Sequence, residues 1–501
     1  MGRGNDNVNS APHYLLIDNF RFLLVSLNIE AILQESTIYR RRERLSKMTD
    51  GFGLEDAYGA MIERIKVQGG DKSRLGMEAL MWISHAERPL KVEELCYALA
   101  IELGTKDFND SNVPSILTLV SCCQGLITID RDASTVRLIH FTLQEYLYAH
   151  PDIFSKPHSR MAEICLTYLN SEQVVALSAD PSATITDDKP FLPYCSVYWG
   201  VHAKRDLSDY AKSLALELFQ KYDGHISTKL LLEMEALWFR DFGTSFLFNG
   251  LHCASFFGIV EIVATLINTG CYDINEGDFG GNTPLAWAAH NGHDEAVKIL
   301  LGRENINPNK LNDHGQTPLS LASWGGREGV VKLLLRLEEV NPDKPDDNGR
   351  TPLSYAAWGG REGVVKLLLG RQKVNPDKPD NHSRTPLSYA VWGGHEEVVN
   401  IILKREEVSP DKPDIVGRTP LSYAAQDGHE AVVKILLGRK EVNPDKPDYS
   451  ARTPLLHAAS GGHEGVVKIL LGRKEVNPRQ SRYSRPNTPL VCYSGRTRGG
   501  F

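Results

Sequence analysis

The tripeptide Thr-Pro-Leu recurs along the second half of the chain at a constant interval of 34 residues. Its copies begin at Thr283, Thr317, Thr351, Thr385, Thr419 and Thr453. One interval upstream, the string 249–254 fills the same positions in degenerate form, and a late copy at Thr488 arrives one residue out of phase. This fixed period predicts about seven stacked structural repeats, because a single short unit cannot bury its apolar face alone.

The unit that begins at Thr351 predicts two short helices and a turn. Thr351 can cap a helix, and Pro352 fits its first turn, where the missing N–H has no helical partner. Glycines at 359–360 end this helix, and the valines and leucines after them give a second helix an apolar face. The segment 374–380 contains two prolines and is expected to be an extended connector.

The repeated pattern T-P-L-x-x-A-A-x-x-G, followed by V-V-x-x-L-L, resembles the ankyrin repeat over roughly residues 246–478. The resemblance implies an α-solenoid that binds other proteins through a concave face made by the first helices and the turn tips. Serine stands at Ser354, Ser388 and Ser422, where the family carries His. We therefore expect a turn tip of altered shape in a stack that is otherwise preserved.

Two positions on the first helices face the concave side in that family, and aromatic residues fill many of them here. The first reads Trp287, Leu321, Tyr355, Tyr389, Tyr423 and His457; the second reads Phe256, His290, Trp324, Trp358, Trp392, Gln426 and Ser460. Large amphipathic rings anchor protein interfaces. The hypothesis is a binding surface centred on Trp324 to Trp392 and made of Trp287, Trp324, Tyr355, Trp358, Tyr389, Trp392 and Tyr423. The alternative is that these rings only stack on their equivalents in adjacent repeats.

Four units carry an arginine before the Thr and an aspartate four residues earlier. The pairs are Asp346 with Arg350, Asp380 with Arg384, Asp414 with Arg418, and Asp448 with Arg452. Such a row of opposite charges predicts salt bridges between repeats and fixation of the turn. We interpret it as structural, because exposed ion pairs contribute little.

Residues 71–155 have the pattern of a winged helix. Helical patterns at 73–85, 92–101 and 114–124 precede alternating strands at 126–130 and 135–139 and a last helix at 140–148. This pattern raises a DNA-binding hypothesis. However, segment 114–124 has no Lys or Arg, and residues 71–150 hold more acidic than basic groups. Phosphate neutralisation would fail, so nucleic acid is not an expected partner.

Several strings in this half resemble fungal NACHT-ankyrin proteins. They are L-G-M-E-A-L-M-W-I-S-H-A-E-R-P-L-K-V-E-E-L-C-Y-A-L (75–99), V-R-L-I-H-F-T-L-Q-E-Y-L (136–147), C-L-T-Y-L (165–169) and P-Y-C-S-V-Y-W-G-V-H-A (193–203). In that family they form the winged helix after the NACHT ATPase and the helical linker before the repeats. Residues 22–48 look like the last helices of the NACHT domain. The resemblance implies a mainly α chain: a winged-helix-like domain and helical linker, then the ankyrin α-solenoid.

The chain lacks the phosphate-binding loop of such an ATPase. The string G-x-x-x-x-G-K-[ST] is absent, and its nearest lookalike, 69–73, has an Asp where the loop needs Gly and is interpreted as a linker. In related ATPases, the His that opens an H-x-x-x-Q-E segment touches the nucleotide, which implies such a role for His140. A separate NACHT-type ATPase would then have to supply the nucleotide. The alternative is a partly buried residue that anchors the last helix.

Composition and motifs exclude several other classes. A net charge of −7 gives no pull toward polyanions, and eight scattered cysteines without C-x-x-C indicate a reducing compartment. The N-terminus has no signal-peptide core, and the apolar stretch 20–33 is short and interrupted by polar residues. Because G-x-S-x-G, H-E-x-x-H and clustered metal ligands are also missing, we expect a cytoplasmic, non-enzymatic protein with no cofactor, metal or membrane partner.

These features predict six segments. They are a disordered N-terminus at 1–13, the end of a NACHT domain with a linker at 14–70, the winged helix at 71–155, a helical linker at 156–245, the repeats at 246–478, and a degenerate repeat or basic tail at 479–501. We expect an adaptor or sensor arm that binds a protein or peptide. The alternative is the C-terminal fragment of a STAND-type signalling ATPase, an NLR-like receptor for nonself recognition; a DNA-binding regulator is a third, disfavoured option.

Overall fold

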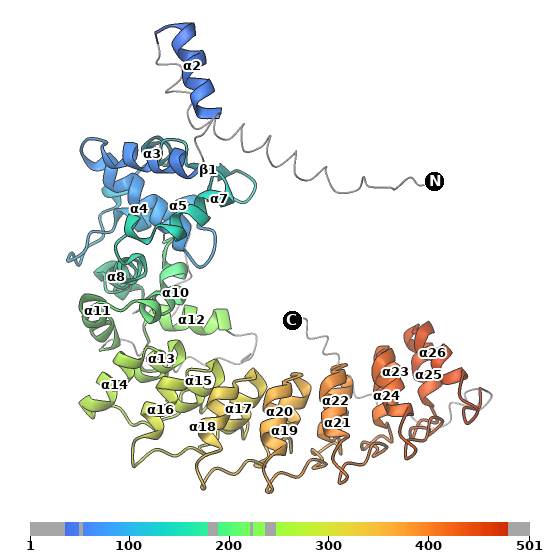
Figure 1. The fold of residues 1–501 in the computed structure, drawn as a ribbon. Helices are drawn as coiled ribbons and strands as arrows, with labels where there is room; N and C mark the ends of the chain where they lie inside the picture. Colours follow the sequence, from blue (N-terminus) through green and yellow to red (C-terminus); the bar gives the residue numbers. More distant parts are fainter. Residues whose placement is uncertain (1–35, 50–53, 179–188, 221–223, 236–246, 479–501) are drawn as a thin grey trace, which may run out of the picture. The chain divides into compact units, whose positions relative to one another are not determined.

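The structure, a computed structural model, describes residues 36–49, 54–178, 189–220, 224–235 and 247–478. The predicted disordered N-terminus and basic tail lie outside these ranges. The chain divides into two compact units, residues 1–234 and 235–501, which are described separately below (Figure 1). Across the described residues, no helix combines the length and apolar character needed to cross a membrane.

The first unit contains the predicted winged helix. Its elements are α2 (Ile38–Thr49), α3 (Leu54–Lys66), α4 (Asp71–His85), α5 (Val92–Ala100), η1 (Asp110–Asn112), α6 (Ile116–Cys122), β1 (Ile127–Asp130), β2 (Thr135–Leu138), α7 (Phe141–Ala149) and η2 (Pro151–Ile153). The strands are antiparallel, with Ile127 opposite Leu138 and Asp130 opposite Thr135. The Asp130 carboxylate closes the turn by accepting the N–H groups of Asp132 and Ala133, both at 3.1 Å.

Helix α3 lies before the predicted start of the winged helix at residue 71, yet it packs on this body. The ring centroids of Tyr58 and Tyr146 are 5.6 Å apart, and the Tyr58 hydroxyl lies 2.9 Å from Thr142 Oγ1. Met61 and Ile65 of α3 are also buried. The packed body therefore includes α3, which sequence reasoning placed in the preceding linker.

The predicted helical linker forms the rest of the first unit. Its helices are α8 (Pro157–Leu169), α9 (Glu172–Leu177), α10 (Leu192–Arg205), α11 (Asp209–Phe219) and α12 (Ile226–Glu235). Trp82 of α4 is fully buried, with its ring centroid 5.5 Å from that of Phe191 and 5.8 Å from that of Tyr194. The winged helix and the helical linker therefore share one core.

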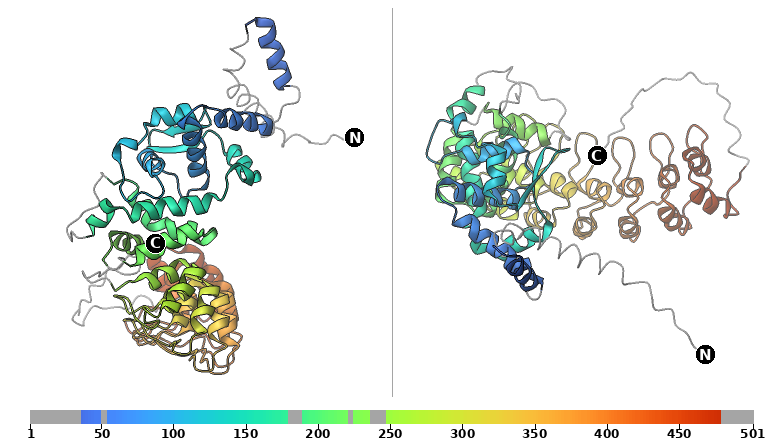
Figure 2. Two further views of the ribbon diagram at one scale, coloured as in Figure 1. Left: turned by 90° about the vertical axis from the view of Figure 1, so that its left-hand side faces the viewer. Right: turned by 90° about the horizontal axis from the view of Figure 1, so that it is seen from above.

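The described part of the second unit, residues 247–478, is a row of seven helix pairs, and Figure 2 shows them following one another. They are α13 (Gly250–Phe257) with α14 (Val260–Thr269), α15 (Pro284–Asn291) with α16 (Asp294–Leu301), α17 (Pro318–Gly325) with α18 (Glu328–Leu334), α19 (Pro352–Trp358) with α20 (Glu362–Leu369), α21 (Pro386–Trp392) with α22 (Glu396–Ile402), α23 (Pro420–Asp427) with α24 (Glu430–Leu437), and α25 (Pro454–Gly461) with α26 (Glu464–Leu471). The buried residues between them are mainly Leu, Val and Ala. The predicted mainly α fold with a repeat solenoid is confirmed.

The serine that departs from the family pattern completes a helix cap. Thr351 Oγ1 accepts the Ser354 N–H at 3.2 Å, and Ser354 Oγ accepts the Thr351 N–H at 3.3 Å. The same reciprocal pair forms at the starts of α21 and α23. The two side chains together satisfy two N–H groups that helix geometry leaves without partners.

The turn tips of neighbouring repeats are joined through their backbones. The N–H of Asn381 donates to the carbonyl of Asn348 at 2.9 Å, and the N–H of Ile415 donates to the carbonyl of His382 at 3.0 Å. Gly349 has a φ of 80°, and a Cβ there would lie 2.7 Å from the Asn381 nitrogen; Ser383 occupies the same position in the next repeat, where the bond also forms. Backbone bonds therefore fix the spacing of the tips.

The connectors add charged contacts between repeats. Lys378 Nζ lies 3.0 Å from Asp343 Oδ2 and 2.8 Å from the carbonyl oxygen of the same residue, one repeat earlier. The equivalent pairs are Lys412 with Asp377 and Lys446 with Asp411. The connectors, predicted only as extended turns, therefore hold adjacent repeats together.

Candidate functional site

The aromatic positions separate into two rows with different environments. The inner row is defined as Trp287, Tyr355, Tyr389 and Tyr423, four residues after each Thr, and these side chains are 1–5% exposed. The outer row is defined as Trp324, Trp358 and Trp392, seven residues after each Thr. Trp324 and Trp358 are half-buried, and Trp392 is 39% exposed. The rows were predicted as one surface, but only the outer row leaves part of its ring area exposed.

Each inner-row side chain donates a hydrogen bond to an aspartate nine residues earlier. The Tyr389 hydroxyl lies 2.7 Å from Asp380 Oδ2. The matching contacts are Tyr355 to Asp346 at 2.6 Å, Tyr423 to Asp414 at 2.6 Å and the Trp287 indole N–H to Asp278 at 2.8 Å. His457 takes this place in the last repeat, 3.1 Å from Asp448. These side chains attach each turn tip to its own first helix.

Asp380 illustrates how the aspartate organises the tip. Its Oδ1 accepts the N–H groups of His382 and Arg384 at 2.8 Å each, and its Oδ2 accepts Arg384 Nε at 2.9 Å as well as the Tyr389 hydroxyl. Burial raises the pKa of this carboxyl, but the hydrogen bonds from Tyr389 and Arg384 together outweigh burial, and the pKa lies below its ordinary value. The carboxylate is therefore buried in its charged form and fully engaged.

The Asp–Arg ion pairs lie within a repeat, not between repeats. Arg350, Arg384, Arg418 and Arg452 each pair with the aspartate four residues earlier. The predicted fixation of the turn is present, but the predicted salt bridging between repeats is not made by these pairs. The guanidinium carbons of Arg350, Arg384 and Arg418 also lie 4.9–5.2 Å from the tyrosine ring centroids of their own repeats. The arginines therefore cover the inner row.

The outer row forms a continuous run of stacked rings. The Trp358 centroid lies 5.0 Å from that of Trp324 and 6.0 Å from that of Trp392, and the planes of the latter pair differ by 10°. Arg384 lies 6.0 Å from the Trp392 ring centroid, within cation–π range. The same position holds Gln426 and Ser460 in the following repeats, where the stack continues. A ring at this position is therefore not required for a repeat to fold.

The recurring histidines after the glycine pairs have structural partners. A ring nitrogen of His395 lies 2.9 Å from the Trp358 carbonyl oxygen, and a ring nitrogen of His463 lies 2.9 Å from the Gln426 carbonyl oxygen. Arg361 makes the same contact with Trp324 at 3.1 Å. These bonds join successive repeats directly behind the outer row and hold its backbone in place.

His140, the residue given a nucleotide role by resemblance, lies at the N-terminus of α7. Its Nδ1 lies 2.8 Å from Thr142 Oγ1 and accepts the Thr142 N–H at 3.3 Å. Its ring packs beside Phe141 at 4.4 Å between centroids. In this geometry the side chain caps the last helix of the winged helix.

A group of three potential metal ligands also lies in the first unit, namely Glu87, His158 and His202, whose ligand atoms are within 4.8 Å of one another. The Nδ1 atoms of the two histidines are 2.9 Å apart. Burial, together with the neighbouring His158, lowers the pKa of His202 to about 3. The Arg205 guanidinium already pairs with the Glu87 carboxylate. Because a cation would have to displace it, we assign this group a structural role.

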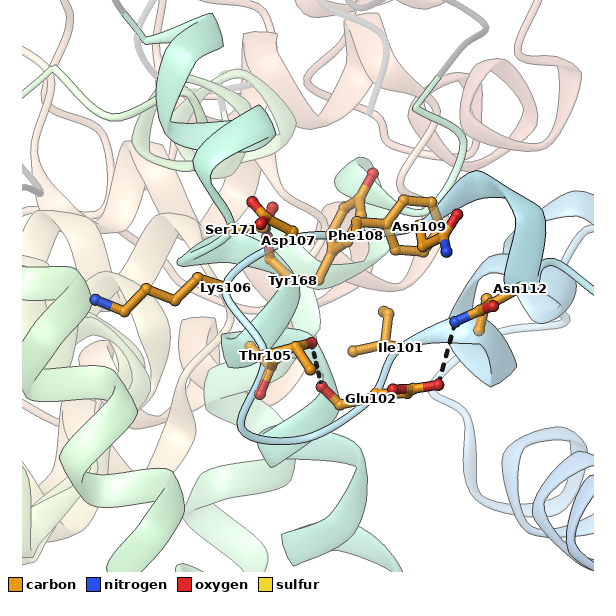
Figure 3. A pocket seen from close by; sticks show the side chains of 12 residues that line it. Ile101, Glu102, Thr105, Lys106, Asp107, Phe108, Asn109, Asn112, Tyr168 and Ser171 are labelled. Atoms are coloured by element: carbon orange, nitrogen blue, oxygen red, sulfur yellow. Dashed lines mark hydrogen bonds between the residues drawn. The ribbon is translucent and has the colours of Figure 1, made fainter.

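A pocket of about 300 Å³ lies beside the loop that follows α5, and Figure 3 shows its lining. The Thr105 hydroxyl donates to the Glu102 carbonyl at 2.8 Å, and the Asn112 side-chain amide donates to the Glu102 carboxylate at 3.1 Å. These polar groups satisfy one another within a single loop. The lining includes no predicted site residue.

A second pocket, of about 240 Å³, lies between α15 and α17 in the repeats. Its lining includes Trp287 and Trp324, one residue from each row, together with His290 and Leu321. Sequence reasoning recorded these residues as members of the aromatic series but did not recognise a pocket. The sequence did carry a signal for the pocket: His290 and Leu321 differ from the residues at the same positions in neighbouring repeats.

Comparison with known proteins finds a family match within each of the two units. The ankyrin-repeat family matches three times, at residues 251–344, 329–414 and 406–481. The family described as GPI inositol-deacylase, winged helix domain, matches residues 63–160. The crystal structure of the human ASB11 ankyrin repeat domain is 25% identical, with a TM-score of 0.40, and the alignment covers 44% of this chain and 96% of that one. Comparison with curated proteins returned no match. Ankyrin repeats and a winged-helix domain are present in this chain.

Proposed function

We propose that this chain is a non-catalytic interaction protein of the cytoplasm that binds a protein or peptide on the concave face formed by the first helices and turn tips. The observation that carries the proposal is the outer row. Three tryptophans occupy a position that Gln426 and Ser460 fill without breaking the stack. Aromatic rings exposed beside arginine are the residue types that dominate binding energy in protein interfaces.

The inner row supports the same assignment, because it accounts for the stability of the turn tips. Its side chains already have structural partners, so the Tyr–Asp–Arg sets explain the stability of the turn tips without the tryptophans. Tryptophans at accessible positions where the fold tolerates smaller residues favour contact with a partner. An ankyrin array with such a surface functions as an adaptor or a sensor arm.

Affinity capture with the full chain tests this function. The variant Trp324→Ala/Trp358→Ala/Trp392→Ala is compared with a control, Lys332→Ala/Lys366→Ala/Lys434→Ala, whose exposed lysines lie on second helices. We expect one partner to be retained by the native chain and the control, lost by the tryptophan variant, and then to bind the purified native chain. Equal capture by all three chains, at equal thermal stability, would assign the outer row to packing alone.

A second candidate function is the C-terminal part of a STAND-type signalling ATPase of the NLR-like class. The match to a winged-helix family beside ankyrin repeats favours it, together with the His140 position at the start of α7. In this reading a separate or upstream NACHT-type ATPase contacts His140 through its nucleotide. Sequencing the transcript upstream of the Met1 codon tests it: an in-frame phosphate loop supports the receptor, and an in-frame stop codon without one supports the adaptor.

A further inference from the structure

The pocket between α15 and α17 exists because one repeat departs from the others at three linked positions. The fourth repeat combines Asp346, Arg350 and Tyr355, whereas the third carries Asn312, Gln316 and Leu321 at the same places. Leu321 cannot reach the turn tip as a tyrosine hydroxyl does, and the space of its missing ring stays open. The remaining lining comes from α15, the two tips and α17: Asn282, Ala286, Trp287, His290, His314 and Trp324.

The polar groups of the third repeat satisfy one another around this opening. Asn312 donates to Asn282 Oδ1 at 2.9 Å and to Gln316 Oε1 at 3.1 Å, and the Gln316 amide donates to the Tyr355 hydroxyl at 2.6 Å. The substitution of Asp by Asn accompanies the loss of the tyrosine donor and of the arginine. The three differences therefore belong together. They leave an open pocket whose wall is uncharged in this repeat and whose polar groups hydrogen-bond to one another.

Two side chains in the lining retain unused hydrogen-bonding capacity. His290 Nδ1 is buried and has no hydrogen-bond partner within the part of the chain that the structure describes, which costs free energy unless a ligand supplies one. Arg350 uses Nε on Asp346 and its guanidinium lies over the Tyr355 ring, but its two Nη groups have no hydrogen-bond or ion-pair partner among the described residues. Both groups can serve an acceptor, and the guanidinium is built to serve a carboxylate through two donors.

The charge of the pocket lining favours an anionic ligand. Arg350 is its one fully charged residue, and the lining contains no carboxylate. Two aspartates of the adjoining turn tips, Asp278 and Asp346, are buried and bonded to Trp287 and Tyr355. Trp287 and Trp324 supply apolar walls for methylene groups. At about 240 Å³, the pocket is smaller than the roughly 300 Å³ at which small-molecule sites begin, so it suits one side chain.

We propose that this pocket receives the carboxylate side chain of an acidic residue, Glu or Asp, from the protein bound along the outer row. Arg350 meets the carboxylate, His290 supplies a further hydrogen bond, and the two tryptophans enclose the aliphatic stem. This assignment rests on the proposed function and adds to it the chemistry of one residue in the partner. Trp324 belongs to both sites, so the pocket lies at one end of the outer row.

The test uses the full chain and three blocked amino acids, acetyl-glutamate N-methylamide and its glutamine and phenylalanine equivalents, in saturation-transfer NMR titrations. We expect the glutamate probe to bind at millimolar concentration and about tenfold more tightly than the glutamine probe, because charge-assisted hydrogen bonds are about twice as strong as neutral ones. The variant Asn312→Asp/Gln316→Arg/Leu321→Tyr, which rebuilds the set of the fourth repeat and fills the pocket, should lose this binding and keep its thermal stability.

Equal binding of the glutamate and glutamine probes, tighter binding of the phenylalanine probe, or no binding of any probe would overturn the pocket assignment. So would glutamate binding that survives in the filled variant. The double variant Trp358→Ala/Trp392→Ala leaves the pocket lining intact and separates the two proposals. If the double variant fails to capture the partner and the native chain binds no glutamate probe, the binding role of the outer row is supported and the pocket assignment is refuted. If the native chain binds the glutamate probe but the native chain and the double variant capture the partner equally, the proposed function is refuted.

Discussion

Replacing Tyr389 by Phe removes one hydroxyl group from the middle of the repeat array and nothing else. The Tyr389 side chain is 2% exposed, so water cannot take the place of the lost donor. Asp380 keeps its contacts with the Arg384 guanidinium and with two backbone N–H groups, but its Oδ2 loses the bond at 2.7 Å. A hydrogen bond to a charged group contributes about 1.5–3 kcal/mol. We expect the free energy of unfolding of the repeats to fall by that amount.

The assay is urea denaturation of the full chain followed by circular dichroism, with hydrogen exchange of peptides from α21 and α23 to locate the loss. Tyr449→Phe is the matched control, because this tyrosine is 79% exposed and its change should stay within about 0.5 kcal/mol. A double-mutant cycle of Tyr389→Phe with Asp380→Asn should give a coupling energy of about 0.5–3 kcal/mol. If Tyr389→Phe and Tyr449→Phe behave alike, the inner row does not hold the turn tips as described.

Three further outcomes follow from the described contacts. Ser383 and Ala451 each have a φ of 59°, at the left-handed turn position where the fourth repeat has Gly349. The variants Ser383→Gly and Ala451→Gly should each raise the urea midpoint of unfolding by the equivalent of about 0.5–1 kcal/mol. A lower midpoint would contradict this. Burial keeps the folded pKa of His202 at about 3, below its ordinary value of 6.5. Between these two pH values the unfolded chain binds more protons than the folded chain. The stability present above pH 6.5 should therefore be lost as the pH falls, at up to about 1.4 kcal/mol per pH unit. His202→Gln should flatten that dependence in urea titrations of the first unit at pH 7 and pH 5, and an unchanged slope would assign the acid sensitivity elsewhere. Lys412→Met should cost at most about 1 kcal/mol, because its ion pair with Asp377 is one partly exposed contact among many between those repeats.

The repeat stack could be predicted from the sequence because its determinants are local. The Thr cap, the proline after it, the glycines and the valine–leucine face all act within one unit, and the interval repeats them in phase. The division of the aromatic residues into two rows could not be predicted in the same way. It depends on a bond between Tyr389 and an aspartate nine residues earlier, and family geometry had assigned both rows to one face.

Other features depend on residues too far apart for a local pattern to reveal. The shared core of the winged helix and the helical linker brings Trp82 against Phe191 and Tyr194, and the connector pairs join Lys378 to Asp343 in the preceding repeat. The pocket was accessible in principle, since Leu321 breaks the aromatic series. Recognising it required knowing that a tyrosine at that place would fill the space.

The most direct test of the two-row description is a calorimetric titration of the captured partner against the full chain and its variant Trp358→Gln/Trp392→Gln. Glutamine is chosen because Gln426 occupies this position in the next repeat. We expect equal thermal unfolding of the two chains and an affinity at least about thirtyfold weaker for the variant, the effect of losing one interface hot spot of 2 kcal/mol. An affinity within twofold of the native value, or a collapse of the fold, would contradict the assignment of the outer row to binding and the inner row to structure.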